Sequence, residues 1–170
     1  MRAIAKLAAN PAVLALAAVL AISGCASKKA PNNAADLGLG AGAGAATPGS
    51  PQDFTVNVGD RIFFDTDSSV IRADAQQTLA KQAQWLNKYG NYPVLIEGHA
   101  DERGTREYNI ALGARRAAAT RDYLASQGVA AKRIKTISYG KERPVAVCDD
   151  ISCWSQNRRA VTAITGGGGS

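Results

Sequence analysis

The chain has 170 residues, of which 46% are hydrophobic and 20% are charged, and this composition leaves room for one folded domain with flanking segments. The single histidine excludes a metal site built from several histidines. The net charge is +6, but the basic residues form no stripe interleaved with aromatic residues, so nucleic acid is a poor candidate partner.

The first 24 residues have the pattern of a secretory signal. Arg2 and Lys6 make its start positive, and residues 11–22 are almost wholly apolar but fewer than the roughly 20 residues that span a bilayer. Small residues directly precede Cys25, as in lipoprotein processing sites. We therefore predict cleavage before Cys25 and acylation of this residue, which would anchor the chain to a membrane. The alternative is an ordinary signal peptide that happens to end at a cysteine.

Composition divides the remaining chain into three parts. Residues 25–52 are dominated by Ala, Gly, Pro, Asn and Ser, which bury little apolar surface, so we predict a flexible tether. Residues 53–165 have the length of one small domain. Residues 166–170 contain only Gly and Ser, a tail that cannot fold alone.

Hydrophobic periodicity predicts strands that alternate with helices in the domain. The predicted strands are Phe54–Val58 with Arg61–Phe64, Val94–Glu97, Ile134–Tyr139 and Arg159–Ile164. The predicted helices run from a cap at Asp74 to about Tyr89, and from Thr105 to Gln127, where Gly128 ends the helix. This order, β-α-β-α-β-β, predicts the α+β class as an α/β sandwich, with helices packed on one mixed sheet.

Two cysteines remain in the domain once Cys25 is assigned to lipid. Cys148 and Cys153 are separated by four residues, and in an exported chain such a pair favours a disulfide. The alternative is half of a metal site, which would need two further ligands in a chain with one histidine. That residue, His99, is interpreted as structural rather than catalytic, and Asn157–Arg159 are interpreted in the same way.

An acid and a base flank the junction between the predicted strand at Val94–Glu97 and the helix that follows. Asp101 comes just after the strand, and Arg116 lies fifteen positions later inside the helix. A carboxylate accepts charge-assisted hydrogen bonds from an ammonium, and a guanidinium binds a carboxylate with two bonds. The pair therefore suits a ligand that carries both an amine and a carboxylate. An internal salt bridge between Asp101 and Arg116 is the alternative.

The segment 96–117 resembles the peptidoglycan-binding motif of OmpA-like domains. The likeness rests on Gly-His-Ala-Asp, which ends at Asp101, and on Leu-Gly-Ala-Arg-Arg-Ala around Arg116. It implies that Asp101 and Arg116 hold the diaminopimelate of the wall peptide, and that Phe64, Asp65 and Asp67 form a second edge of the site. It further implies roles for residues of the helix start and its first turns, namely Gly104, Thr105, Tyr108, Asn109 and Leu112. Tyr108 and Asn109 are expected either to line the pocket or to cap the loop.

Within that family, the architecture is most similar to the lipid-anchored members of the Tol–Pal system. This resemblance implies a non-catalytic protein without a cofactor that links the outer membrane to peptidoglycan during cell division, with TolB and other Tol proteins as partners. Ala26, where inner-membrane lipoproteins carry Asp, implies the outer membrane, with the domain facing the periplasm. One alternative is a wall-modifying amidase or peptidase that binds the same ligand. Another is a stator-like wall anchor, which would carry an uncleaved membrane helix in place of Cys25.

Overall fold

The structure, a computed structural model, describes residues 46–164. The predicted signal segment, Cys25 with most of the tether, residue 165 and the tail at 166–170 lie outside the described residues. Along residues 46–164, no helix combines the length and the apolar character needed to cross a bilayer.

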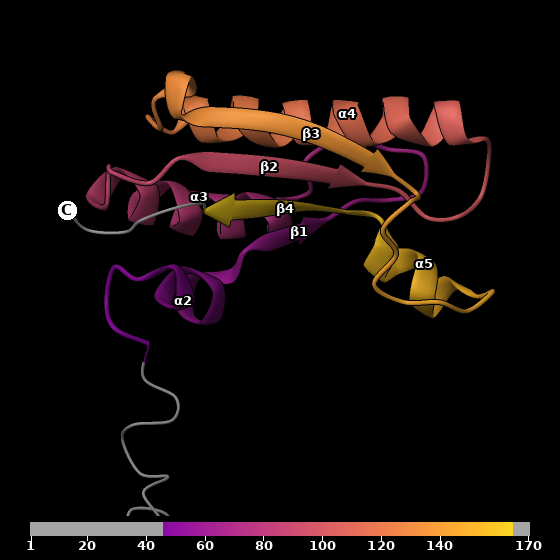
Figure 1. Ribbon diagram of the computed structural model, residues 1–170, viewed down its shortest axis with the longest axis horizontal. Helices are drawn as coiled ribbons and strands as arrows, with labels where there is room; N and C mark the ends of the chain where they lie inside the picture. Colours follow the sequence, from indigo (N-terminus) through magenta and orange to yellow (C-terminus); the bar gives the residue numbers. More distant parts are fainter. Residues whose placement is uncertain (1–45, 165–170) are drawn as a thin grey trace, which may run out of the picture. The chain divides into compact units, whose positions relative to one another are not determined.

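Four strands form one mixed sheet in the described part of the chain (Figure 1). They are β1 (Arg61–Phe63), β2 (Val94–His99), β3 (Ile134–Gly140) and β4 (Arg159–Ile164). Their order across the sheet is β1-β4-β2-β3, with β2 parallel to β3 and β4 antiparallel to both β1 and β2. The predicted α+β class and the mixed sheet are confirmed. One addition to the predicted order is a short helix, α5 (Ile151–Asn157), before the last strand.

The two long helices, α3 (Ala73–Lys88) and α4 (Arg106–Ser126), pack on the same face of this sheet. In α3, the Gln82 side chain accepts a hydrogen bond of 2.8 Å from Thr162 of β4. In α4, Gly113 lies against Gly98 of β2. Apolar side chains from both helices and from the inner face of all four strands make one continuous core. On the opposite face of the sheet, side chains such as Phe63 and Ile137 are partly exposed.

Helix α3 follows its predicted periodicity but not its predicted cap. Ala75, Leu79, Ala83 and Leu86 are buried at helical spacing, with Trp85 beside them. Asp74 is not the cap: it lies inside the first turn, and Arg72 occupies the cap position without a side-chain capping bond. The Arg72 guanidinium instead donates to the Asp74 carboxylate at 3.1 and 3.0 Å. The Asp74 carboxylate still favours the helix start, because it lies near the positive end of the helix dipole.

The predicted strand at Phe54–Val58 is wrong. This segment continues a short helix, α2 (Pro51–Asp53), as a π-helical turn, η2 (Phe54–Gly59). Two start signals outweigh the alternation of its residues: the Ser50 hydroxyl accepts a bond from the backbone N–H of Asp53, and proline occupies the first helical turn. Phe54 then packs edge-on against Trp85, with ring centres 5.0 Å apart.

Helix α4 approaches the backbone of β2 unusually closely. A Cβ atom at Gly98 would collide with the carbonyl group of Gly113, so both positions need glycine. Thr105 caps the start of α4, and Gly128, with φ of +91°, follows its end as predicted. The close contact brings Arg116, one turn beyond Gly113, within reach of the end of β2.

Candidate functional site

A cavity of about 310 Å³ lies where β2 ends and α4 begins. Most of the predicted site residues line it, namely Asp67, Asp101, Gly104, Tyr108, Asn109, Leu112 and Arg116. Thr66 and Arg103 line it as well, although they lie outside the predicted set. The three remaining predicted residues, Phe64, Asp65 and Thr105, lie outside the lining.

Asp101 is only 7% exposed, and its carboxylate is already engaged. Arg103 donates three hydrogen bonds to it: one from the backbone N–H at 3.2 Å and two from the guanidinium at 3.1 and 2.7 Å. Arg158 adds one of 3.3 Å. Burial acts to raise the pKa of Asp101, but the bonds and charge of Arg103, helped by Arg158, more than offset it and hold the pKa below its usual value. Asp101 is therefore ionised at neutral pH and neutralised by two arginines.

Arg116 is completely buried and works as a structural clamp. Its guanidinium donates to the carbonyl oxygens of Ser68 at 2.8 Å, His99 at 2.8 Å and Asp65 at 3.1 Å. It thereby ties the loop after β1 to the end of β2. Burial lowers its pKa to about 10, so it stays charged at neutral pH.

Because Asp101 and Arg116 are predicted to hold a ligand, both should be accessible in the empty site, but both are buried. Among the described residues, the ion pairs of Asp101 are with Arg103 and Arg158 rather than with Arg116. The internal salt bridge weighed as the alternative is therefore not formed either. Each side chain has other partners instead. Arg116 donates hydrogen bonds to backbone carbonyls, and Arg103 and Arg158 neutralise Asp101.

The predicted second edge of the site is only partly formed. Phe64 is 1% exposed and belongs to the core. Its side chain is therefore not available to a ligand, contrary to the prediction. The Asp65 carboxylate is exposed and pairs with Arg72 at 3.3 Å, away from the cavity lining. Asp67 does line the cavity, in the left-handed region at φ of +56°, and its carboxylate accepts a hydrogen bond from the Tyr108 hydroxyl.

Hydrogen bonds from neighbouring side chains fix the loop between β2 and α4. The Asn109 amide donates to the Arg103 carbonyl at 2.7 Å, so Asn109 both caps the loop and lines the cavity. The Lys141 ammonium donates to the carbonyls of Glu102 at 3.1 Å and Gly104 at 2.7 Å. The Thr105 hydroxyl caps α4 by accepting from the Tyr108 backbone N–H at 3.2 Å. These bonds fix the orientation of the side chains that the loop presents to the cavity.

His99 is the last residue of β2 and is buried, as expected for a structural residue. It is buried between Tyr139 and Arg159, with a ring centre 5.5 Å from that of Tyr139 and Nδ1 3.4 Å from the Arg159 guanidinium. Burial, reinforced by the charges of Arg159 and Arg143, lowers its pKa to about 4. A neutral, inaccessible imidazole with this pKa is poorly suited to accept a proton from a nucleophile.

Acid is expected to destabilise the domain through His99. Between the unfolded pKa of 6.5 and the folded pKa of about 4, the unfolded chain binds a proton that the folded chain does not. The free energy of unfolding should therefore be greatest above pH 6.5 and fall by about 3 kcal/mol as the pH drops to 4. Urea unfolding at pH 7 and pH 4.5 should show a smaller drop for His99→Gln than for the wild type. An equal drop in the two proteins would contradict this role of His99.

The two cysteines of the domain form the predicted disulfide, with Cα atoms 5.7 Å apart. Their sulfurs are bonded to each other, so they cannot serve as thiolate ligands and the metal alternative is wrong. Asp150 lies close to both sulfurs, but its carboxylate caps α5 by accepting a hydrogen bond of 2.7 Å from the Ser152 backbone N–H.

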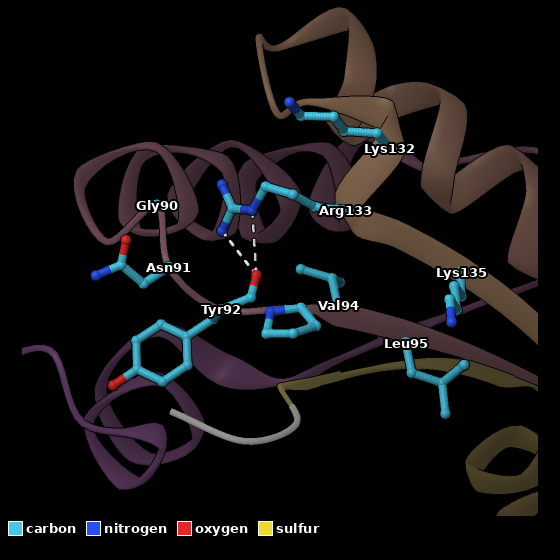
Figure 2. A pocket seen from close by; sticks show the side chains of 9 residues that line it. Gly90, Asn91, Tyr92, Val94, Leu95, Lys132, Arg133 and Lys135 are labelled. Atoms are coloured by element: carbon cyan, nitrogen blue, oxygen red, sulfur yellow. Dashed lines mark hydrogen bonds between the residues drawn. The ribbon is translucent and has the colours of Figure 1, made fainter. Parts of the chain in front are cut away.

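A larger cavity, of about 480 Å³, lies where β2 and β3 begin, next to the short helix η3 (Ala131–Arg133). Figure 2 shows that the Arg133 guanidinium points to the Tyr92 carbonyl, to which it donates at 2.9 and 3.1 Å. It also donates to the Leu86 and Tyr89 carbonyls at 3.0 and 3.3 Å. These bonds hold the turn between α3 and β2. None of the predicted site residues line this cavity.

Known proteins share this motif and this fold. The OmpA family matches residues 63–158, which include all the residues that line the cavity at Asp101. The chain belongs to the OmpA family. A peptidoglycan-associated lipoprotein of Mesorhizobium japonicum is 77% identical over 168 residues, which cover 99% of each chain. One of Agrobacterium fabrum is 77% identical over 164 residues, which cover 96% of this chain and 92% of the relative.

Solved structures agree with this family membership. The crystal structure of the peptidoglycan-associated lipoprotein from Burkholderia pseudomallei matches with a TM-score of 0.64 and 38% identity, over 68% of this chain and 99% of that one. The C-terminal domain of Helicobacter pylori MotB matches with a TM-score of 0.60 over 64% of this chain and 86% of that one, but its 22% identity supports the fold alone. The resemblance inferred from the motif is therefore confirmed: the chain falls among the peptidoglycan-associated lipoproteins of the OmpA family.

Proposed function

We propose that this protein is a non-catalytic anchor that binds peptidoglycan in the cavity at Asp101, through the diaminopimelate of the wall peptide. The observation that supports the proposal most strongly is that the ionised Asp101 carboxylate lines the same cavity as the guanidinium groups of Arg103 and Arg116. These opposite charges complement an amino acid side chain that ends in both an ammonium and a carboxylate. Names of close relatives support the wall as the source of that ligand.

Because Asp101 is already paired, ligand binding must exchange partners rather than fill a vacant acceptor. Arg103 can leave, because its side chain is 41% exposed, whereas Arg158 is buried and also bonded to the Phe64 carbonyl at 3.1 Å. In the proposed exchange, the ligand ammonium replaces the Arg103 guanidinium at Asp101, and the released guanidinium binds the ligand carboxylate. The exchange leaves no charge unpaired, which keeps the desolvation cost low.

The helix start provides a second group for the ligand carboxylate. The first backbone N–H groups of α4 have no partner within the helix, and the dipole of this 21-residue helix makes its start positive. Gly104, with φ of +86°, directs the chain into that start without a side chain that would cover it.

Binding to purified sacculi tests the anchor function directly. The protein should sediment with sacculi, free diaminopimelate should displace it, and the supernatant should contain no more stem peptide or sugar than a blank. Time-dependent release of either product would favour the amidase or peptidase alternative. Failure to sediment at all would contradict wall binding.

We also propose that Cys25 carries the lipid that holds the protein at the outer membrane, with the domain in the periplasm. The small residues before Cys25 support acylation, and Ala26 supports outer-membrane sorting. Cys25→Ser should appear in the soluble periplasmic fraction without acyl chains, as measured by fractionation and mass spectrometry. If the variant keeps its acyl chains and still fractionates with the outer membrane, the anchor lies elsewhere.

Family membership further supports a role in the Tol–Pal system, in which TolB and other Tol proteins would compete with the wall for the domain during cell division. If so, digestion of the wall before cross-linking in envelopes should increase the yield of a TolB cross-link. An unchanged yield would argue that the two partners bind independently.

A further inference from the structure

Trp154, in the short helix α5, contacts the loop that carries Asp101. The Arg103 guanidinium stacks on the Trp154 ring, with its central carbon 4.1 Å from the ring centre. The Trp154 indole N–H donates to the Glu102 carboxylate. One aromatic side chain therefore holds the two residues that directly follow Asp101. In Figure 1, α5 lies at the end of the sheet where β2 and β3 end, which is the end that carries the candidate site.

Helix α5 needs external support, because a helix of seven residues is too short to be stable alone. The disulfide supplies that support at its start, since Cys153 is the residue directly before Trp154. Asn157 supplies it at the other end: its buried side chain accepts from the backbone N–H groups of Val145 and Ala146 at 2.9 and 3.2 Å and donates to the Ala146 carbonyl at 2.8 Å.

The consequence for the site follows from the exposure of Arg103. A guanidinium that is 41% exposed would ordinarily sample many rotamers, and an exposed ion pair gains little from such a mobile partner. Stacking on an aromatic ring restricts the guanidinium to one plane, which is the plane from which it reaches both oxygens of Asp101.

We propose that Trp154, held by the Cys148–Cys153 disulfide, is a positioning residue that sets the orientation of Arg103 toward Asp101 and so tunes the affinity of the site for its ligand. The effect on affinity rests on the proposed function, whereas the effect on Arg103 and Asp101 does not. When a ligand ammonium replaces the Arg103 guanidinium at Asp101, that guanidinium can stay stacked on the Trp154 ring. The released guanidinium then stays beside the cavity and available to the ligand carboxylate.

Four variants separate positioning from general stability. Trp154→Leu removes the ring, Trp154→Phe keeps a stacking face but loses the N–H, and Cys148→Ser with Cys153→Ser frees α5. Ile151→Ala is the matched control, because Ile151 is an exposed apolar residue of the same helix. Alkylation of the denatured, unreduced wild type, which should modify neither Cys148 nor Cys153, first verifies the disulfide.

Two readouts are measured on the mature chain: the Asp101 titration followed by carboxyl NMR without ligand, and the dissociation constant of a diaminopimelate-containing wall tripeptide. Trp154→Leu should raise the pKa of Asp101 toward its ordinary value and weaken binding by on the order of three- to ten-fold. Trp154→Phe should recover part of both effects, the double serine variant should resemble Trp154→Leu, and Ile151→Ala should match the wild type.

Equal values of both quantities in folded Trp154→Leu and Ile151→Ala would overturn the proposal. So would a Trp154→Phe variant no better than Trp154→Leu. If the wild type does not bind the tripeptide, the proposed function fails, and the Asp101 titration alone then decides whether Trp154 positions Arg103.

Discussion

Replacing Arg116 with alanine is expected to lower the free energy of unfolding by about 3–5 kcal/mol. The reason is that three carbonyl oxygens, those of Asp65, Ser68 and His99, lose their buried donor at once. A loss of this size is comparable to the whole stability of a marginal domain, so the alanine variant should be tested by urea unfolding at low temperature. Arg116→Lys should fall between alanine and the wild type, because one ammonium cannot reach three carbonyls in the geometry of a guanidinium.

The adjacent arginine provides the control for this prediction. Arg115 has the same charge and helix propensity but is exposed, so Arg115→Ala should change the free energy of unfolding by no more than about 0.5 kcal/mol. A folded Arg116→Ala protein within 1 kcal/mol of the wild type would mean that the clamp contributes little.

Asp101→Asn is expected to affect binding more than folding. The amide keeps the size of the side chain and an acceptor for Arg103, but it removes the charge that an ammonium needs. Removing one partner of a desolvated charge pair costs about 2–5 kcal/mol, which is a loss of roughly 30-fold to several thousand-fold in affinity for wall fragments. Some stability should also be lost, because the buried Arg158 loses its carboxylate partner.

Glu107→Gln is the matched control for Asp101→Asn, since it removes one negative charge from an exposed position in the first turn of α4. Calorimetric titration with a wall tripeptide and thermal melting should be run on both variants. Near-wild-type affinity in folded Asp101→Asn would exclude Asp101 as the ammonium acceptor.

Sequence pattern predicts the two long helices and the four strands of the sheet. Periodicity is clearest in α3, where Ala75, Leu79, Ala83 and Leu86 present one apolar face to the core. It failed at Phe54–Val58, where alternation suggested a strand. There, local capping by Ser50, the proline at Pro51 and the contact between Phe54 and Trp85 favour a helical turn. Helix α5 was not predicted, since seven residues held by a disulfide carry too little periodicity to stand out.

The motif identified the residues of the site but not their environment. Asp101 and Arg116 line one cavity as predicted, yet both are buried and each has other partners. Those partners are carbonyls of a distant loop for Arg116 and two further arginines for Asp101, and spacing along a sequence does not report such contacts. Arg103 is not among the predicted residues, but its position two residues after Asp101 is a signal that could have identified it. A basic side chain at this spacing can fold back on the carboxylate.

The most direct test of the central claim compares two wall tripeptides that differ only in carrying diaminopimelate or lysine. Lysine keeps the ammonium but lacks the second carboxylate, so it should reach Asp101 without a group for Arg103 or the start of α4. A charge-assisted hydrogen bond contributes about 1.5–3 kcal/mol, so calorimetry should give the lysine peptide a dissociation constant roughly 10- to 100-fold higher. Equal dissociation constants for the two peptides would contradict recognition of diaminopimelate at this site.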